Sequence, residues 1–560
     1  MNTKRKASFS VLATVAGTLF LGSLGAQLPV PIQPIPAQPA EWSCGDVYYV
    51  GVAGSDAGAG TLASPWRTVT FAVSQALSLT PNGTPITINI LAGTYNANEN
   101  FPIRLPARGI KLQAFEPGVT ISGEQFEPVL RVNRSGPSGG ACGFTPSTVI
   151  RGLTLTQGII GLEIDTSLIG QAPNTPDRVL VQQCNLVNNL GTGALIWTRT
   201  GRFSQHVIED CEIAFNANSS GFGDGVAMFN LGGTASNLVR SNNIHDNEVG
   251  IFVQGLPGPT EPRIFSNFVR DAEWGIALFN CNARVVNNTQ GYGRPFSPQQ
   301  DVFGVLLAGG GDVTLANNII WNPASYAVNA SSVTDFSNQG SGTLTNVSNW
   351  ILSVVGAAND PQFLNPPTNL HVSQTSPILD AGDNTFMLPA ININVNGMTV
   401  QADCAKDVDG DSRIIDFAQD TTPDVEIGAD ERTDGGGAAV RLTSNQLDAF
   451  GNLHTSGVPT PVQLDMAGNP GDLTVVFFWW PNSIDPVPFH RFSAVGSWSI
   501  PGSNVRRVGT GTIGAGGTFP APLTIPPALG LELELYFQGA TLNANGGSVV
   551  SNRLLLEINE

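Results

Sequence analysis

Two short segments of the sequence repeat the same acidic and basic positions. Residues 245–250 (HDNEVG) align with residues 270–275 (RDAEWG) at a constant separation of 25 residues. If this separation is one structural repeat, equivalent side chains lie over one another, about 4.8 Å apart as in neighbouring strands. The pairs formed in this way are Asp246 with Asp271, Glu248 with Glu273, and His245 with Arg270. Carboxylates this close repel each other, which raises the pKa of at least one of them unless a cation lies between.

A cluster of this kind favours chemistry on a sugar polymer. Two neighbouring carboxyl groups can serve a retaining glycosidase. They can also hold a calcium ion, with an arginine as the base or the charge stabiliser of a lyase reaction. The expected catalytic residues are Asp246, Asp271, Glu248 and Glu273, assisted by Arg270 or His245. The neighbouring Trp274 can offer a face on which a sugar ring stacks.

The alternative interpretation of the cluster is structural. Turns between repeats are solvated and collect charged residues. The facing acids are then held apart by water, and Arg270 pairs with one of them. Further acids in the preceding repeat extend the acidic strip and favour a site; they are Glu209, Asp210, Glu212 and Asp224.

The elements that must position these residues come from a repeat between about Val179 and Ala330. Each unit alternates apolar and polar residues up to a Cys or Asn, and a glycine then opens a second apolar strand, with spacings of 21 to 32 residues. The Cys or Asn positions are Cys184, Cys211, Asn242, Asn267, Asn288 and Asn317, and the glycines are Gly193, Gly225, Gly250, Gly275 and Gly304. Short period-2 strands without helical spacing predict a parallel β-helix, in which each coil pairs with the next.

The Cys/Asn position predicts a ladder inside the solenoid. Stacked coils place equivalent side chains one strand spacing apart, so that an Asn at a turn can bond to the Asn above and below it. Cys is small and is easily buried in the same position.

Composition limits the partners of the chain. It has 560 residues, a formal net charge of −18 and only 12% charged residues, with 64 glycines. The glycine content suits a turn-rich solenoid. A chain this acidic does not attract polyanions, which argues against nucleic acid as a partner.

The N-terminal residues predict export. Residues 1–26 combine a basic start (Lys4, Arg5 and Lys6), an apolar run and a small-residue cleavage site, as in a signal peptide. A Pro-rich spacer follows over residues 27–45, and no later stretch is apolar enough to predict a transmembrane segment. We therefore expect a secreted or cell-surface protein.

A helical N-terminal cap is expected at the start of the solenoid. Five residues fall on one helical face: Val69, Ala72, Val73, Ala76 and Leu77. Such a helix would cover the open apolar end of the coils. The stretch YYVGVAGSDAGAGTLASPWRT, followed by ILAGTY and FPIRLPARGIKLQA, resembles the domain of unknown function that opens exported bacterial right-handed β-helix proteins of the pectate-lyase-like class. The resemblance covers about residues 46–330 and implies right-handed coiling and a carbohydrate-related role.

The end of the solenoid resembles a second family. SPILDAGDN (376–384), DVDGDSR (407–413) and VEIGADE (425–431) are similar to the closing segment of the surface β-helix proteins called choice-of-anchor Q. Glu426 stands where that family usually has Asp. The resemblance implies a secreted or surface role and no particular reaction.

The expected architecture is all-β. A right-handed parallel β-helix with its cap and closing segment spans 46–433, and a small antiparallel β-sandwich spans 438–560, where strand-like runs alternate with Pro- and Gly-rich turns.

A second acidic loop is a candidate calcium site. Asp407, Asp409 and Asp411 alternate around Gly410, and such oxygens can wrap a hard cation outside the cell. The alternative is an Asp/Gly turn whose side chains cap the backbone.

The six cysteines permit disulfides in an exported chain. Cys44 with Cys142 is the first expected pair, whereas Cys184 and Cys211 are either a bonded pair or buried thiols. Two functions remain open. One is binding or cleavage of an extracellular polysaccharide along the side of the solenoid. The other is a non-catalytic role in adhesion or in the structure of the cell envelope.

Overall fold

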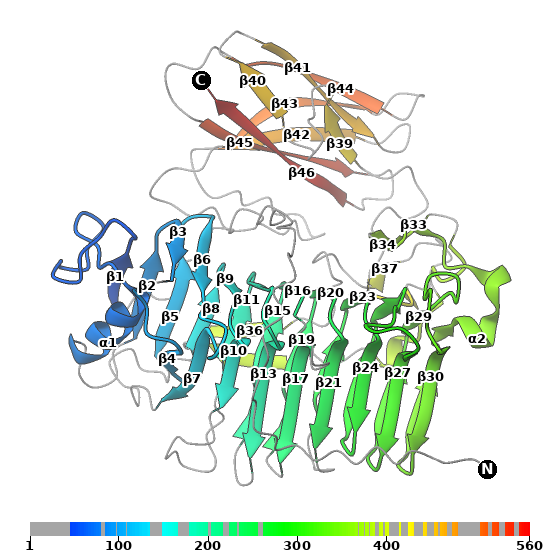
Figure 1. The fold of residues 1–560 in the computed structure, drawn as a ribbon. Coiled ribbons are helices and arrows are strands. Elements are labelled where there is room, and N and C mark those ends of the chain that lie inside the picture. Colours follow the sequence, from blue (N-terminus) through cyan, green and yellow to red (C-terminus); the bar gives the residue numbers. More distant parts are fainter. Residues whose placement is uncertain are drawn as a thin grey trace.

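In the computed structural model, parallel strands wind into a long solenoid (Figure 1). The structure describes residues 45–79, 85–134 except 97 and 108, 148–165, 179–199, 203–216, 223–231, 234–255, 261–386 except 368, 374–375 and 380, and segments between 391 and 559. No helix in these parts of the chain is long and apolar enough to cross a membrane.

Each coil contributes one strand to each of three parallel sheets, here called the first, second and third sheets. The first sheet contains β1 (Asp46–Val50), β2 (Ile86–Ile90), β5 (Ile110–Ala114), β8 (Thr148–Arg151), β11 (Val179–Gln182), β15 (Val207–Glu209), β19 (Leu238–Arg240), β22 (Arg263–Phe265), β25 (Ala283–Val286), β28 (Val313–Ala316) and β31 (Leu344–Val347). The second sheet contains β3 (Gly93–Tyr95), β6 (Val119–Ser122), β9 (Thr154–Thr156), β12 (Asn185–Val187), β16 (Glu212–Ala214), β20 (Asn243–His245), β23 (Phe268–Arg270), β26 (Thr289–Gly291), β29 (Ile319–Trp321) and β32 (Trp350–Ile351). The third sheet contains β4 (Ile103–Pro106), β7 (Leu130–Arg134), β10 (Ile160–Asp165), β13 (Thr192–Arg199), β17 (Asp224–Leu231), β21 (Val249–Gly255), β24 (Trp274–Phe279), β27 (Asp301–Gly309) and β30 (Ser332–Gly340). The predicted parallel β-helix is therefore confirmed.

The core runs through the middle of the coils. Inward residues such as Ile208, Ile213 and Met228 are buried in one continuous apolar cluster. Burial of alternate residues on all three sheets stabilises the stack, because a single coil has no apolar interior of its own.

The predicted Asn ladder lies at the turn from the first to the second sheet. The Nδ2 atom of Asn242 donates to Oδ1 of Asn267 at 2.9 Å, and Asn267 donates in the same way to Asn288. The next member is Asn318, which bonds to Asn349. The prediction of Asn317 was wrong by one residue. In the pair Asn317-Asn318 the first residue takes the left-handed turn conformation (φ 54°), and the second is the ladder member.

A second ladder, which the sequence analysis did not identify, lies at the turn from the second to the third sheet. Asn189 donates to Asn216 at 2.9 Å, and Asn216 donates to Asn247 at 3.2 Å. Beside it, the predicted glycine positions stack at the start of the third sheet. A Cβ on Gly250 would lie 2.5 Å from the carbonyl oxygen of Gly275. Glycine is therefore required there by close backbone approach.

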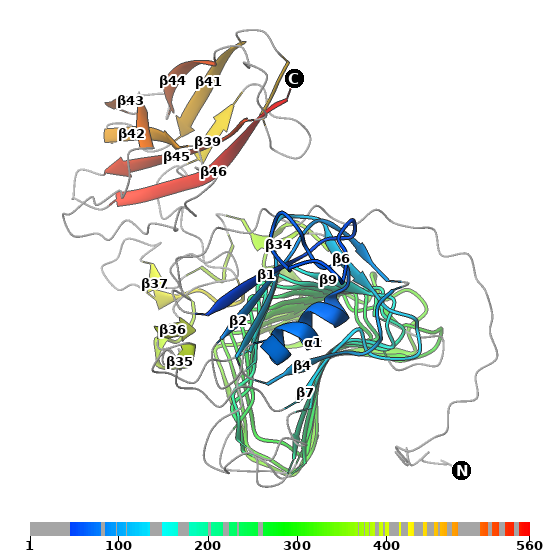
Figure 2. The same ribbon diagram turned by 90° about the vertical axis from the view of Figure 1, so that its left-hand side faces the viewer.

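Helix α1 (Val69–Leu79) lies in the stretch where the sequence predicts a helix. It buries Val69, Ala72, Val73 and Ala76, and it contacts β1, β2 and β4. Figure 2 shows it across the near end of the coils. Its role as a cap stays a prediction.

The segments after the last coil pack against the outer face of the second sheet. Ile378, Ile427 and Ala429 form an apolar cluster with outward residues of that sheet, among them Ile319 and Trp321. Short elements in this region are α2 (Leu352–Val355), η2 (Ala357–Asn359), β33 (Phe363–Asn365), β34 (Asn369–Val372), η3 (Asn384–Phe386), β35 (Ile391–Val395), β36 (Met398–Ala402), β37 (Ile414–Ile415) and β38 (Asp424–Val425). Two further strands, β14 (Phe203–Ser204) and β18 (Thr234–Ala235), pair between coils.

The C-terminal strands form two sheets. The first is antiparallel and contains β39 (Arg441–Ser444), β41 (Thr460–Ala467) and β44 (Thr518–Ile525). The second contains β40 (Leu453–Ser456), β46 (Ser548–Asn559), β45 (Leu533–Leu542), β42 (Leu473–Trp479) and β43 (Val505–Thr512). Its β40–β46 pair is parallel, so the expectation of a purely antiparallel arrangement was wrong at this pair. The sandwich and the domain boundaries stay predictions.

Candidate functional site

The six residues predicted to be catalytic lie in two stacked turns between the second and third sheets. Strand pairing places His245 beside Arg270 in the second sheet and Val249 beside Trp274 in the third. The 25-residue register is therefore confirmed on both sides of the turn. The acids lie in the connecting residues 246–248 and 271–273.

Asp246 and Asp271 occupy the same backbone position in their turns. Their φ angles are 53° and 52°, in the left-handed region. Asp tolerates this conformation because its short polar side chain can bond locally. Other coils place Asn188, Phe215 and Tyr292 at the equivalent position. The backbone of the solenoid therefore fixes the positions from which these two side chains project.

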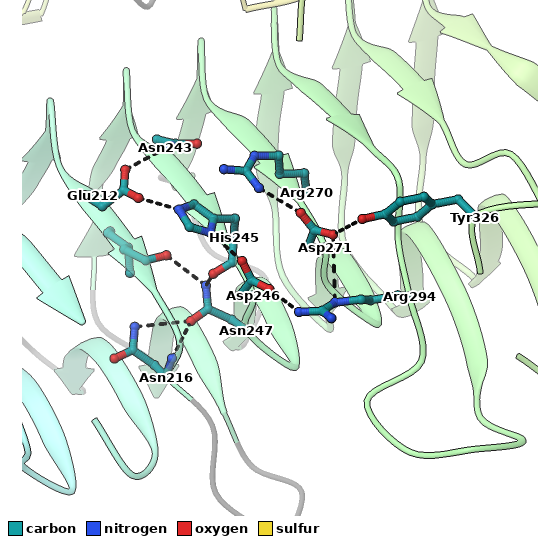
Figure 3. A network of polar contacts seen from close by, with 11 residues as sticks. Glu212, Asn216, Asn243, His245, Asp246, Asn247, Arg270, Asp271, Arg294 and Tyr326 are labelled. Atoms are coloured by element: carbon teal, nitrogen blue, oxygen red, sulfur yellow. Dashed lines mark hydrogen bonds and ion pairs between the residues drawn. The ribbon is translucent and has the colours of Figure 1, made fainter. Parts of the chain in front are cut away.

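A cation from a later coil lies between the two aspartates. The guanidinium of Arg294 donates to Oδ1 of Asp246, and its Nε lies 3.8 Å from Oδ1 of Asp271 (Figure 3). Arg270 donates to Oδ2 of Asp271 at 2.8 Å, and the hydroxyl of Tyr326 donates to Oδ1. Arg270 therefore pairs with one acid, as the structural interpretation predicts, and Arg294 bridges both.

His245 lies on the other side of Asp246. Its Nδ1 atom is 2.7 Å from Oδ2 of Asp246, and its Nε2 atom contacts Oε1 of Glu212 (Figure 3). Burial alone would lower the pKa of His245, but the bonds to Asp246 and Glu212 raise it above its ordinary value. Burial would raise the pKa of Asp246, whereas His245 and Arg294 hold it below its ordinary value. The two carboxylates therefore favour the protonated form of His245, and His245 and Arg294 favour the ionised form of Asp246. We call these residues the turn cluster: Glu212, His245, Asp246, Arg270, Asp271, Arg294 and Tyr326.

Glu248 and Glu273 bond outside the turn cluster. The carboxylate of Glu248 accepts the N–H of Gly223 at 3.1 Å, and that of Glu273 accepts the N–H of Phe296 at 3.2 Å. Burial raises the pKa of Glu273 to about 7, and the charges of Glu248 and Asp301 add to this shift. Burial also raises the pKa of Glu248.

Four acids mark the edge where strands of the third sheet begin. Burial, together with the charge of Glu248, raises the pKa of Asp224 to about 7. Each acid is the first residue of its strand or lies up to one residue before it. This carboxylate edge consists of Asp224, Glu248, Glu273 and Asp301, at β17, β21, β24 and β27.

Arg294 and Tyr326 were missed by the sequence analysis. They belong to the loops between β26 and β27 and between β29 and β30. Arg294 reaches Asp246, 48 residues earlier, and Tyr326 reaches Asp271, 55 residues earlier. The spacing of 29 residues from Gly275 to Gly304 signals a longer loop. No pattern in the sequence gives the direction in which that loop leans.

A surface pocket opens beside the bridged aspartates. It encloses about 370 Å³, part of it open to solvent, and is lined by Asp246, Asp271, Arg294, Pro295 and Phe296. Phe296 is 42% exposed, so the pocket combines charged oxygens with an accessible aromatic ring.

Aromatic side chains line the outer face of the third sheet, and they reach the carboxylate edge at Trp274 and Phe303. In β21, Ile251 and Val253 point into the core, whereas Phe252 and Gln254 point outward and are half-buried. Ring centroids are 4.6 Å apart for Trp197 and Phe229. The same distance is 5.6 Å from Phe229 to Phe252 and 5.5 Å from Phe252 to Phe279. Trp274 contacts Phe279 and Phe303 at 6.3 Å. We call this set the aromatic row: Trp197, Phe229, Phe252, Trp274, Phe279 and Phe303.

The aromatic row crosses the strands and follows the solenoid axis. Trp197 and Phe229 lie on paired positions of β13 and β17, and their planes differ by 19°. Each of the six rings is half-buried, so part of each ring is exposed. No other described element lies over this face in Figures 1 and 2. The row is therefore an accessible, mostly apolar strip several strands long.

The remaining predicted sites are placed as follows. Asp407, Asp409 and Asp411, and also Cys44 and Cys142, lie outside the described residues. Within the described parts of the chain, no group of three or more His, Cys, Asp or Glu residues could hold a metal ion. Cys184 and Cys211 are buried free thiols.

A match to a family model supports the β-helix. Residues 169–341 match the family model of the right-handed β-helix region. A solved structure of XylC in complex with xylose covers 49% of this chain and 69% of its own, at 9% identity and a TM-score of 0.30. A solved glycoside hydrolase covers 54% of this chain and 96% of its own, at 8% identity and a TM-score of 0.30. No curated protein matches the sequence.

Proposed function

We propose that this chain binds an extracellular polysaccharide along the outer face of the third sheet. The observation that carries the proposal is the aromatic row, whose rings are half-buried and which reaches the carboxylate edge at Trp274 and Phe303. A polysaccharide offers apolar C–H faces and hydroxyl groups along one direction. Aromatic rings supply dispersion contact with low conformational entropy cost, and carboxylates accept hydrogen bonds from hydroxyls.

The length of the row favours an extended ligand over a small molecule. The row spans strands from β13 to β27, and neighbouring strands are about 4.8 Å apart. Extended apolar strips on a soluble protein mark interaction sites. A polymer lying across the strands would contact several rings at once, and the binding free energies of these weak contacts would sum.

Binding is placed before cleavage because the oxygens of the two aspartates predicted to be catalytic, Asp246 and Asp271, are occupied. Both carboxylate oxygens of Asp246 have a partner, His245 or Arg294. Both oxygens of Asp271 have one as well. A nucleophile or a base needs a free oxygen aimed at the substrate.

Affinity electrophoresis tests the proposal. Purified protein is run through native gels that contain one polysaccharide each from a panel of plant, algal and bacterial polymers. We expect at least one polymer to retard the protein, and the double variant Phe252→Ala/Phe279→Ala to lose most of this retardation. The matched control is Phe126→Ala, because Phe126 is 83% exposed and lies outside the row. Equal retardation of the double variant and the wild type would refute the proposal, as would a panel without any retardation.

A second candidate function is hydrolysis of the bound polymer. It is favoured by two carboxyl groups whose pKa values are shifted apart: burial raises that of Glu273 to about 7, whereas His245 and Arg294 lower that of Asp246 despite its burial. An acid kept protonated near one kept ionised is the arrangement of glycosidases. The loop that carries Phe296 must first move, because its N–H binds Glu273.

Reducing-end and unsaturated-product assays on the retarding polymers, with and without calcium, test this candidate. If the chain hydrolyses the polymer, Glu273→Gln and Asp246→Asn lose activity while retaining retardation. The exposed Glu124→Gln, which lies outside the carboxylate edge, serves as the control. A wild-type protein that binds a polymer and releases no new ends makes the chain a non-catalytic adhesion or envelope protein.

The proposed role requires a place outside the cell. The signal peptide expected over residues 1–26 and the resemblance of the closing segment to surface proteins support a secreted or cell-surface location. Detection of the mature protein in the medium or on intact cells would test it.

A further inference from the structure

Four acids border the outer face of the third sheet, and burial raises the pKa of two of them, Asp224 and Glu273, to about 7. The four acids of the carboxylate edge lie along the border where β17, β21, β24 and β27 begin. The sequences of these four strands contain no Lys or Arg. A ligand over these four strands therefore meets carboxylates and aromatic rings without a basic residue, whereas β13, which carries Trp197, ends in Arg199.

Two cations described near this face, Arg294 and Arg131, already have carboxylate partners. Arg294 bridges Asp246 and Asp271 beside the pocket. Arg131, on β7 at the other end of the sheet, pairs with Glu163 at 2.6 Å. Recruiting either cation to an anionic ligand would leave a carboxylate unpaired, which offsets the gain.

The whole chain adds to the local field. Its formal net charge of −18 repels polyanions at a distance and slows their approach. Ionised carboxylates are acceptors only, and they pair well with hydroxyl groups, which donate. Sugar hydroxyls therefore suit the carboxylate edge, whereas uronate or sulfate groups do not.

We propose that the polysaccharide held on the outer face of the third sheet is uncharged, a neutral glycan rather than a uronate or sulfated polymer. This inference rests on the proposed function, because it assumes that a glycan binds to the aromatic row. It deepens that function by naming the class of ligand.

Matched polymer pairs test the inference. The protein is run in native gels with hydroxyethylcellulose against carboxymethylcellulose, arabinoxylan against glucuronoxylan, and galactan against polygalacturonate. We expect retardation by the neutral member of at least one pair, and about tenfold weaker or no retardation by its charged partner. Retardation by the neutral member should be unchanged between about 50 mM and about 500 mM salt, because no charge pair is formed.

A variant with an added positive charge tests whether charged polymers are excluded by electrostatic repulsion or by poor steric fit. Gln254 lies on the strand position between Phe229 and Phe279, and its half-buried side chain points outward. Gln254→Lys places a cation within the aromatic row. We expect this variant to gain about tenfold in affinity for the charged member of the pair at low salt, and to bind the neutral member within about threefold of the wild type. Gln125→Lys adds the same charge at an exposed turn outside the third sheet. It should change the affinity for neither the neutral nor the charged polymer.

The outcomes separate this inference from the proposed function. A charged polymer that binds as tightly as its neutral partner, or more tightly, overturns the neutral-ligand inference and leaves polysaccharide binding intact. A failure of every polymer to retard the folded protein overturns both. A neutral polymer that retards the protein, with its charged partner excluded and then admitted by Gln254→Lys, supports both.

Discussion

At the scale of single residues, the turn cluster is an ionic network with no spare oxygen on its two aspartates. Asp271 is only 7% exposed and is held by Arg270, Arg294 and Tyr326. A buried charge network costs most when one partner is removed, since the remaining charge stays desolvated. The cluster therefore stabilises the turn whatever ligand lies beside it.

Asp271→Asn should lower the free energy of unfolding. The change leaves Arg270, whose side chain is 13% exposed, without its carboxylate, at a cost of about 3 kcal/mol. Asp301→Asn is the matched control, because Asp301 is exposed and the change should cost less than about 0.5 kcal/mol. Urea unfolding followed by circular dichroism gives both values. Equal stabilities of the two variants would contradict the network.

Stability should fall as the pH rises from 5 to 8. Burial raises the pKa values of Glu273 and Asp224 to about 7, so the folded state binds protons that the unfolded chain releases above about pH 4. The raised pKa of His245 acts in the same direction, because its stabilisation is lost as the imidazolium deprotonates. The lowered pKa of Asp246 contributes only below this window.

The urea midpoint at pH 5 should therefore exceed the midpoint at pH 8. In the double variant Glu273→Gln/Asp224→Asn the difference should shrink, and the contribution of His245 should remain. A midpoint that rises with pH, or a difference that the double variant does not alter, would show that these carboxyls titrate normally.

The contacts of the turn cluster differ in how far apart the two partners lie in the sequence, and this decided which of them could be predicted. The vertical pairs of acids follow from a 25-residue repeat, which the sequence displays. Arg294 and Tyr326 come from loops that lean back over earlier coils. Loop direction depends on packing against neighbouring coils, and periodicity contains no information about it.

At the scale of elements, two Asn ladders and a glycine column hold the coils in register. Each Asn amide donates to the next coil and to a backbone carbonyl, as Asn267 does to Asn288 and to Val239. The glycines leave room for the next coil, since the Cβ of an Ala at position 250 would lie 2.4 Å from Cγ1 of Val269. The first ladder was predictable because Cys and Asn recur. In the second, only Asn189, Asn216 and Asn247 recur before Ala272 ends it.

Gly250→Ala should destabilise the solenoid by about 2 kcal/mol or more, because the clash is with backbone that neighbouring coils fix. Gly310→Ala is the control, since its Cβ would meet nothing closer than Oγ of Ser341 at 4.0 Å. Thermal unfolding of the two variants measures the contrast. If the Gly250→Ala protein is as stable as the control, the glycine column can accommodate a Cβ atom and the prediction is wrong.

At the scale of the whole molecule, the described part of the solenoid carries a half-buried aromatic strip on its third sheet. The parallel β-helix was predictable because short strands with period-2 alternation recur along the sequence. The aromatic row was not, because its rings occupy different strand positions: Trp197 pairs with Phe229, whereas the partner of Phe229 in β21 is Gln254. The row becomes visible only when the coils are stacked.

The most direct measurement is a crystal structure of the chain with an oligosaccharide cut from the polymer that retards it most. The account predicts a sugar chain on the outer face of the third sheet, crossing at least three of the strands β13, β17, β21, β24 and β27. Its rings should contact the aromatic row, and its hydroxyls should bond to the carboxylate edge. A well-ordered oligosaccharide bound elsewhere, with this face bare, would contradict the account.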